Sequence, residues 1–267
     1  MTNDTPDRPV PNMPVAGRSR KMSGNTPEGP RRGRKTKPEK LEDATRMMTK
    51  KVKTARGRKM SSKLWLERQI NDPYVMKAKS QGYRSRAAFK LKELDEKFHL
   101  IKKNSLVVDL GCAPGGWLQV SMELGAEKVV GIDILPVESV GGAEILHMDF
   151  INYRAPEALR SHLGRAPDVV LSDLAANTTG HKQTDHLKTV ALVEAAAEFA
   201  MDVLAQNGHF VTKVFQGGAE KTMLDRLKHN FKTVRHAKPK SSRAGSPEMY
   251  LVATGFRGKK NREQSQY

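Results

Sequence analysis

From residue 105 onward the chain alternates short apolar segments of strand length with longer segments of helical periodicity, and this alternation constrains the fold more than any other feature. The predicted strands cover 105–110, 128–134, 144–147, 168–172, 208–215, 233–236 and 248–254, and the predicted helices cover 116–123, 155–163, 186–205 and 219–230. Strands joined by crossover helices form a parallel, doubly wound sheet. The last two strands are joined by a loop without a helix, so one of them is expected to be antiparallel. We therefore predict an α/β fold whose doubly wound sheet is mostly parallel, with one antiparallel strand near the C-terminus.

The segment that precedes the sheet is predicted to be helical. Its apolar residues fall into two groups at helical spacing, Trp65, Leu66 and Ile70 and then Tyr74, Val75 and Ala78. These groups indicate two short helices. A third helix is expected to begin at an N-cap, Ser85, and to run to about Phe98.

The first 60 residues differ from the rest in composition. Residues 1–63 hold 18 Lys+Arg and 6 Asp+Glu, which is +12 of the net charge of +18. This region is rich in Pro, Gly and Ser and cannot bury enough apolar surface to fold, so we predict that 1–60 is a basic, disordered tail. It is either an arm that gathers RNA by releasing counterions or a tail that only aids solubility. The last residues, 258–267, form a polar C-terminal tail.

The remaining composition bounds the location of the protein. The single cysteine, Cys112, cannot form an internal disulfide, which favours a reducing cytoplasm. The sequence has neither an apolar run of about 18 residues, as a membrane span requires, nor the apolar core of a secretory signal. The excess of positive charge favours a polyanion as partner, and nucleic acid before a membrane.

The strongest local motif is DLGCAPGGW, which runs from Asp109 to Trp117. A buried strand leads into a glycine-rich turn and a helix, an arrangement that lets the backbone approach a ligand at the edge of a sheet. The glycine spacing fits neither a dinucleotide-binding turn nor a P-loop. Asp133 ends the next strand and is placed to accept hydrogen bonds from ribose hydroxyls, and Asp149 follows the third strand, within reach of an adenine amino group. Together these features predict a nucleoside-type cofactor without a phosphate requirement.

Two residues of this motif have ordinary alternatives. Trp117 either forms a wall of the cofactor site or belongs to the hydrophobic core. Cys112 is better explained as a small apolar side chain than as a nucleophile.

Polar residues also follow the later strands. Asp173 comes directly after the fourth strand, Lys213 lies inside an apolar fifth strand and Glu248 begins the last one. If the last strand is antiparallel, these three meet at one sheet edge, and Lys90 is a candidate fourth member. Because like charges disfavour one another, a lysine held beside a second lysine releases its proton more readily. This pattern is the one needed to deprotonate a ribose hydroxyl, whereas the structural alternative is a buried Lys213–Asp173 salt bridge.

Basic residues flank these positions and are expected to contact RNA phosphates, although each has an ordinary solvated surface as its alternative. They are Arg84, Arg86, Lys238, Lys240 and Arg243. His181, Asp185 and His186 lie in one short polar turn, which is a poor ligand set, so no metal site is expected.

Seven ordered segments together resemble the FtsJ-like methyltransferases of bacterial large-subunit ribosomal RNA, the heat-shock type. They are RSRAAFKL, DLGCAPGGW, GIDILP, HMDF, LSDLAAN, KVFQG and SSRAGSPEMYLVATG, and the likeness as a whole covers residues 61–257. The resemblance implies a class I, Rossmann-like methyltransferase domain over 61–257 and S-adenosylmethionine as the methyl donor. It implies a catalytic set of Lys90, Asp173, Lys213 and Glu248. The cofactor positions that it implies are Gly115, Trp117, Asp133, Asp149 and Asp173.

The implied substrate is a uridine 2′-hydroxyl in large-subunit (23S) ribosomal RNA on the assembled 50S subunit. The expected enzyme is cytoplasmic and monomeric. The alternatives are a 2′-O-methyltransferase of another RNA such as transfer RNA, a non-catalytic RNA-binding assembly factor and, least favoured, a nicotinamide oxidoreductase.

The sequence departs from the family pattern in two places. Ala176 stands where members commonly have proline in the D-x-A-P-N motif, which relaxes a backbone restraint without removing a reacting group. The basic N-terminal tail is also longer than in compact bacterial members.

Overall fold

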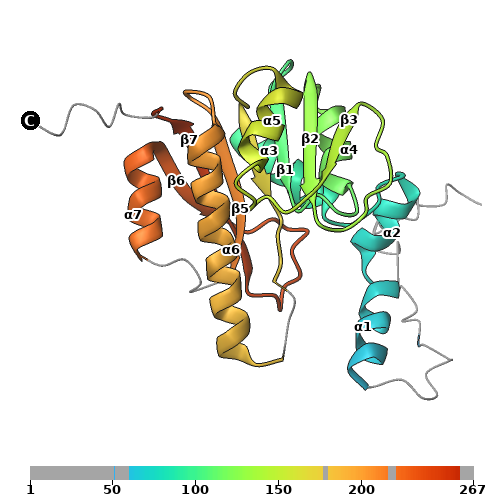
Figure 1. Cartoon of the computed structure of the whole chain (residues 1–267). Helices are drawn as coiled ribbons and strands as arrows, with labels where there is room; N and C mark the ends of the chain where they lie inside the picture. The colour runs from blue at the N-terminus through green and yellow to red at the C-terminus, as the bar shows by residue number, and fades with distance from the viewer. Residues whose placement is uncertain (1–50, 52–59, 177–179, 216–220, 259–267) are drawn as a thin grey trace, which may run out of the picture. The chain divides into compact units, whose positions relative to one another are not determined.

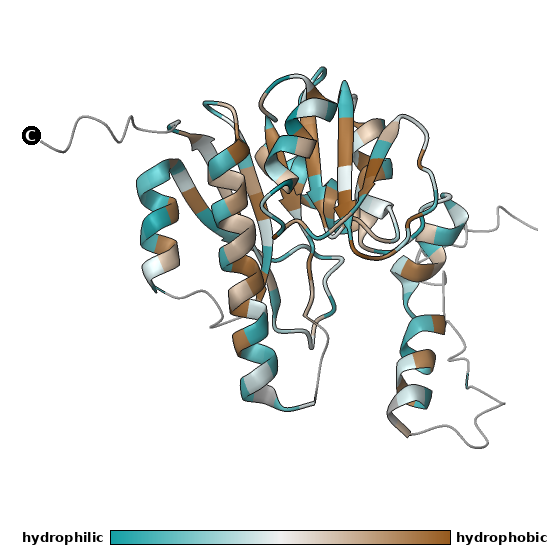
Figure 2. Cartoon of the chain, viewed as in Figure 1, coloured by the Kyte–Doolittle hydropathy of each residue, from teal (hydrophilic) through white to brown (hydrophobic). Residues whose placement is uncertain are grey.

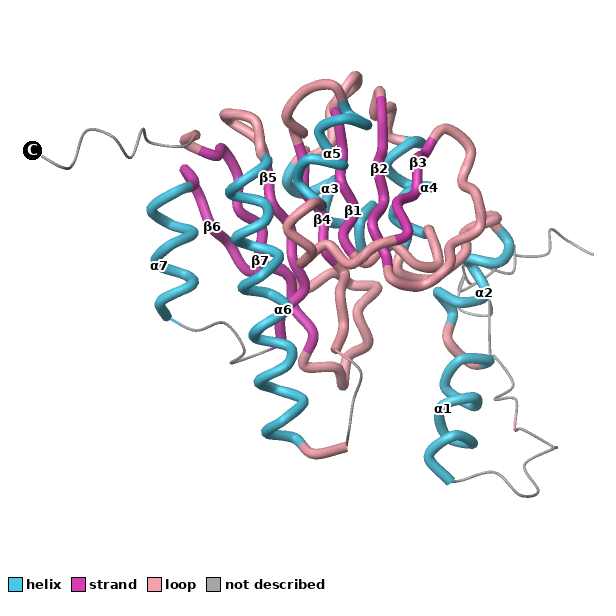
Figure 3. Tube along the Cα trace, in the orientation of Figure 1, coloured by secondary structure: helices cyan, strands magenta, loops and turns pink. Residues whose placement is uncertain are grey.

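The computed structural model describes Lys51 and residues 60–176, 180–215 and 221–258. Nearly all of the two predicted tails, 1–60 and 258–267, therefore lies outside the described residues. The helices are α1 (Met60–Ile70), α2 (Pro73–Ser80), α3 (Ala88–Phe98), α4 (Gly116–Glu123), α5 (Ala155–Leu163), α6 (Lys182–Val203) and α7 (Lys221–Asn230). The strands are β1 (Leu106–Leu110), β2 (Lys128–Asp133), β3 (Ala143–His147), β4 (Val169–Ser172), β5 (His209–Phe215), β6 (Phe231–Ala237) and β7 (Glu248–Phe256), as Figures 1 and 3 show.

The seven strands form one sheet in the order β3-β2-β1-β4-β5-β7-β6. β7 runs antiparallel to both of its neighbours, and the other adjacent strands are parallel. The predicted doubly wound sheet with one antiparallel strand is therefore confirmed. β7 starts where β5 finishes, because Phe215 pairs with Glu248 and Lys213 pairs with Tyr250. The inserted strand thus brings its first residues to the edge where the parallel strands end.

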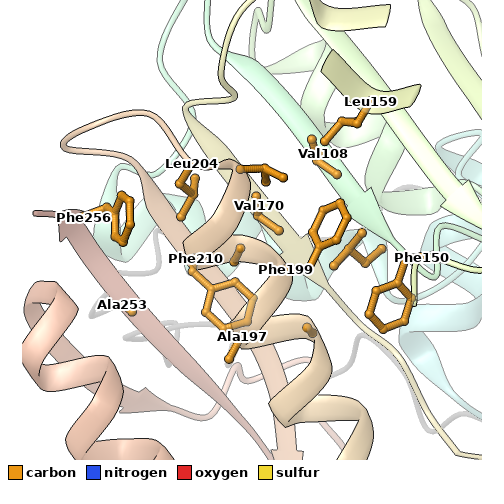
Figure 4. Packing of buried hydrophobic residues seen from close by; sticks show 14 of the residues in the cluster. Val108, Phe150, Leu159, Val170, Ala197, Phe199, Leu204, Phe210, Ala253 and Phe256 are labelled. Carbon is orange, nitrogen blue, oxygen red and sulfur yellow. The ribbon is translucent and has the colours of Figure 1, made fainter. Parts of the chain in front are cut away.

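Helices cover both faces of the sheet, which explains why the central strands are buried along their whole length. All five residues of β1 and all four of β4 are buried. On one face α5, α6 and α7 pack against the strands, and Figure 4 shows Leu159 and Phe199 meeting Val108, Val170 and Phe210 there. On the other face α3 and α4 contribute Leu91, Leu94 and Leu118 to a second core. Figure 2 shows hydrophobic residues along the central strands and mixed residues along α6 and α7.

The structure corrects several predicted boundaries. α3 begins at Ala88, three residues after the predicted cap, because residues 84–87 form turns instead and the Ser85 carbonyl accepts from the amide of Ala88 at 3.3 Å. α6 begins at Lys182, four residues early, and ends at Val203. β6 starts at Phe231, directly after α7, because its full length pairs with β7. The predicted start of the last helix, at residue 219, lies outside the described residues.

Across the described part of the chain, no helix is both long and apolar enough to span a bilayer.

Candidate active site

The glycine-rich turn joins β1 to α4 and packs tightly against three other segments. Gly115 adopts a φ of +106°, a conformation that a side chain would strain. A Cβ on Gly116 would lie 2.5 Å from the Ser85 hydroxyl, and one on Gly111 would lie 2.3 Å from a Leu174 methyl group. The turn is thus built from glycine because neighbouring side chains already occupy the space around it.

The acidic residue at the end of β2 is connected directly to this turn. One oxygen of the Asp133 carboxylate accepts a hydrogen bond from the amide of Ala113 at 2.8 Å, and the other accepts from Leu135 at 2.8 Å. Asp149 follows β3 on the surface, and its carboxylate accepts from the amide of Ile151 at 3.0 Å. Both predicted nucleoside-contacting carboxylates therefore follow neighbouring strands at the carboxyl edge of the sheet.

A third carboxylate, Asp109, lies beneath the turn and is 1% exposed. Neither of its oxygens has a hydrogen-bond partner among the described residues. Burial, followed by the nearby Asp173 and Asp133, holds the pKa of Asp109 well above its usual range. The glycine turn lets backbone approach a ligand, and the Asp133 and Asp149 carboxylates beside it can accept from hydroxyl and amino groups, which fits the nucleoside part of S-adenosylmethionine.

The four predicted catalytic residues, Lys90, Asp173, Lys213 and Glu248, are gathered into one cluster, called the tetrad below. Lys90 Nζ lies 2.8 Å from Glu248 Oε1 and 3.8 Å from Asp173 Oδ2. Lys213 Nζ lies 3.2 Å from Asp173 Oδ1 and donates to the Asp173 carbonyl at 2.7 Å. The Asp173 carboxylate therefore stands between the two ammonium groups, one oxygen toward each. Both lysine residues are buried, at 7% and 8% exposure, so these contacts form largely out of water.

Two further residues hold the tetrad in place and were missed in the sequence analysis. The Tyr250 hydroxyl donates to Asp173 Oδ1 at 2.7 Å, and the Ser242 hydroxyl donates to Glu248 Oε1 at 2.8 Å. Burial, together with Asp173 and Glu248, raises the pKa of Tyr250 well above its ordinary value, which keeps the phenol protonated as a donor. The signal for Tyr250 was available, since it lies two residues after Glu248 and therefore on the same face of a strand.

Trp117 belongs to the core. It is 3% exposed, its indole donates to the Ala87 carbonyl at 2.8 Å, and its ring centroid lies 5.8 Å from that of Tyr250. Of the two alternatives for its side chain, the structure thus supports packing. The ring supports the tetrad indirectly, because it packs against Tyr250. Cys112 is buried at 3% exposure, and burial raises the pKa of its thiol, in agreement with a packing role.

The three flanking arginines contact groups within the protein. Arg84 donates to the carbonyls of Pro114, Glu138 and Ser139 at 3.2, 2.7 and 2.6 Å. Arg86 and Arg243 both contact the buried Asp72 carboxylate, at 3.2 and 3.1 Å. These side chains connect segments of the protein to one another, and phosphate binding by them stays a prediction.

The flanking lysines are more available. Lys238 donates to the Ser246 carbonyl at 2.8 Å, and Lys240 is exposed. Within the described ranges, no group of three or more His, Cys, Asp or Glu residues is arranged to hold a metal ion.

A doubly wound sheet, a glycine turn after the first strand with no dinucleotide spacing, and a buried Lys–Asp–Lys–Glu group beside it define the class: a class I, Rossmann-like S-adenosylmethionine-dependent methyltransferase. The family can be stated more closely. The chain belongs to the FtsJ-like methyltransferases, whose family model matches residues 83–256.

Individual relatives agree with this assignment. The chain is 59% identical over 221 residues to the ribosomal RNA large subunit methyltransferase E of Paramagnetospirillum magneticum, covering 80% of this chain and 91% of the relative. The enzyme of the same name from Sphingopyxis alaskensis is 58% identical and covers 78% of this chain and 91% of its own. Among solved structures, a Plasmodium falciparum protein described as a ribosomal RNA methyltransferase matches with a TM-score of 0.60 and 31% identity, over 66% of this chain and 100% of that one.

Proposed function

We propose that this chain methylates the ribose 2′-hydroxyl of a uridine in 23S ribosomal RNA, on the assembled 50S subunit, with S-adenosylmethionine as donor. The observation that carries the proposal is the tetrad, in which one carboxylate holds two buried lysines beside the glycine turn. Relatives at 58–59% identity bear the name of a large-subunit ribosomal RNA methyltransferase, which favours this RNA over transfer RNA. The tetrad comes from a single chain, which supports action as a monomer. This substrate would place the enzyme in the cytoplasm.

The donor supplies a methyl group activated by its sulfonium. Asp133 and Asp149 are the residues proposed to hold the nucleoside hydroxyls and the adenine amino group. Gly115 and Trp117, at the start of α4, would contribute backbone groups to the donor site, and Asp173 would complete the set. Asp109, whose raised pKa favours the protonated carboxyl, lies beneath the same region.

The contacts of the two lysines suggest different roles. Lys90 is held by Glu248, whose oxygens both lie 2.8 Å from its nitrogen. Lys213 has only the Asp173 side chain and carbonyl as partners in the described structure. We assign Lys213 as the base that accepts the ribose hydroxyl proton, and Lys90 as the fixed positive charge that stabilises the developing alkoxide.

The test is transfer of a labelled methyl group to isolated large subunits that lack the modification, with transfer RNA as comparison. Lys213→Ala should lower kcat by roughly 10²–10⁴-fold while donor affinity stays close to that of the wild type. Lys221→Ala, which removes an exposed lysine at the start of α7, is the matched control and should behave like the wild type. Near-normal turnover of Lys213→Ala would refute the base assignment, and methylation of transfer RNA alone would refute the substrate.

The remaining parts of the chain are assigned by composition. We propose that 61–257 is the methyltransferase domain, that the basic residues of 1–60 increase encounter with RNA, and that 258–267 is a polar tail without a part in the chemistry.

A further inference from the structure

A groove of about 650 Å³ lies outside the tetrad, between α2, α3 and the segment that follows β6. Its lining includes apolar side chains that are largely buried, namely Phe89, Leu94 and Ala237, together with the half-buried ring of Tyr74. The Tyr74 and Phe89 ring centroids are 5.6 Å apart. The volume lies in the range of pockets that hold small organic ligands, of about 300–1,000 Å³, and is ample for a nucleobase.

The rim of this groove is basic. Five lysines line it, against the two carboxylates of Glu93 and Glu96. The Glu93 carboxylate already has a partner within the protein, because both of its oxygens accept from the amide of Ser241, at 3.2 and 3.0 Å. Lys92 is also used, through a 2.7 Å ion pair with Glu123.

Three of the rim lysines remain available. Lys77, Lys97 and Lys240 are exposed and form no ion pair with a described carboxylate. The Lys77 ammonium lies 4.8 Å from the centre of the Phe89 ring, above the apolar part of the groove. Positive charges around an aromatic floor match the chemistry of a nucleotide, whose phosphate is anionic and whose base has an apolar face.

Helix α3 connects this groove to the tetrad. Lys90 belongs to the tetrad, whereas Glu93 and Lys97 line the groove. Residues at positions i, i+3 and i+7 lie on one face of a helix, and seven residues span about 10 Å at about 1.5 Å per residue. The Ser241 amide, held by Glu93, and the Ser242 hydroxyl, bound to Glu248, link the same two places through the β6–β7 loop.

We infer that this groove binds single-stranded RNA next to the methylated nucleotide, with a flanking base on Tyr74 and flanking phosphates at Lys77, Lys97 and Lys240. The inference rests on the proposed function for the identity of the RNA. It extends that function by assigning a second contact site, made partly by α2, which lies before the 83–256 range matched by the family. A protein segment is the competing occupant. The three free cations around an aromatic floor favour RNA.

The experiment uses the full chain and a triple variant, Lys77→Ala, Lys97→Ala and Lys240→Ala. Its matched control replaces Lys221, Lys228 and Lys232 with Ala, which removes the same charge from exposed positions at α7 and the start of β6. Two quantities are measured: steady-state methylation of unmodified large subunits, and the salt dependence of binding to a short labelled single-stranded RNA. Donor affinity and melting temperature are recorded for both variants.

The groove variant should raise KM for subunits on the order of tenfold and leave kcat within about twofold of the wild type. Its slope of log K against log salt should fall by about 2, since each phosphate contact to a single strand contributes about 0.7. The control variant should change neither quantity. Equal behaviour of the two variants would overturn the inference, and so would a higher KM for subunits with an unchanged salt slope, which would identify a ribosomal protein as the occupant.

The aromatic contact has its own test. Tyr74→Ala should weaken binding of the single-stranded RNA by about tenfold, whereas Tyr74→Phe keeps the stacking surface and should bind like the wild type. Equal affinity of all three proteins, at matched melting temperatures, would remove Tyr74 from the site. If the wild type methylated no subunits, the proposed function would fail, and the RNA titrations would still decide whether the groove binds RNA.

Discussion

At the scale of single residues, the site depends on how carboxylates are shared. Asp173 uses one oxygen toward Lys213 and the other toward Lys90, and it also accepts from the Tyr250 hydroxyl. Because the Asp173 carboxylate lies close to both lysines, a small rotation of its side chain changes both halves of the tetrad. Residues that orient Asp173 therefore matter for the reaction without touching the substrate.

Tyr250→Phe tests this dependence. Loss of the hydroxyl removes a hydrogen bond to a carboxylate and should lower the free energy of unfolding by about 1.5–3 kcal/mol. Since Asp173 would then be less firmly oriented, kcat should fall while KM for RNA and donor affinity change little. Steady-state kinetics and chemical denaturation check both effects. A loss of stability with unchanged kcat would show that Tyr250 only packs.

Asp109 predicts a dependence of stability on pH. Its pKa is raised well above the ordinary 3.8, so above about pH 4 the folded protein keeps a proton that the unfolded chain releases. The free energy of unfolding contributed by this group therefore falls as the pH rises through that window. Asp109→Asn, which cannot ionise, should remove the decline, so the ligand-free variant should gain melting temperature relative to the wild type toward pH 8. Parallel curves of melting temperature against pH would contradict the assignment.

At the scale of elements, the site forms where three loops meet at one edge of the sheet. The glycine turn after β1, the loop after β2 and the turn before α3 are connected by Arg84, whose guanidinium donates to three carbonyls. The loop after β4 packs against the same turn through Leu174 and Gly111. The sequence pattern predicted the strands and the glycine turn, because apolar periodicity and glycine content are local properties. It predicted neither the late start of α3 nor the role of Arg84, because both arise from contacts with residues far away in the chain.

Arg84→Ala distinguishes a connecting role from phosphate binding. Loss of the three hydrogen bonds should loosen the glycine turn and raise the Kd for the donor several-fold. Each hydrogen bond contributes about 1 kcal/mol net, and water would replace part of that contribution. Affinity for single-stranded RNA and its salt dependence should stay unchanged. Calorimetric titration with the donor and RNA binding at several salt concentrations give the two readouts. The opposite pattern, with weaker RNA binding and unchanged donor affinity, would support the predicted phosphate role.

At the scale of the whole molecule, charge is divided between two regions. Residues 1–63 carry +12 of the net +18, whereas the candidate active site lies in the sheet domain that follows them. Electrostatic attraction of this kind raises the rate of encounter and the affinity for RNA in a salt-dependent way, without contributing to the chemical step. The chemistry and the collection of substrate are therefore expected to be separable.

Removal of residues 1–59 tests this separation. The shortened protein should show a higher KM for large subunits at low salt, and a smaller difference from the full chain as salt screens the charges. Its kcat and donor affinity should match those of the full chain. Methylation assays across a range of salt concentrations provide the measurement. A large fall in kcat would show that the tail takes part in the reaction itself.

The sequence alone predicted the fold class and the order of strands and helices, because hydrophobic periodicity, glycine turns and polar residues at strand ends are local properties of the chain. Together with the family resemblance it also predicted which four residues form the tetrad. Tertiary structure decided which contacts those residues make. The pairing of Phe215 with Glu248 brings the start of β7 to the end of β5, and this register sets Tyr250 against Asp173. Tertiary packing also places Trp117 in the core, engages the donors of Arg84 within the protein, and leaves a groove between α2 and α3. Such outcomes depend on the distances between residues brought together only by folding, and no local pattern encodes those distances.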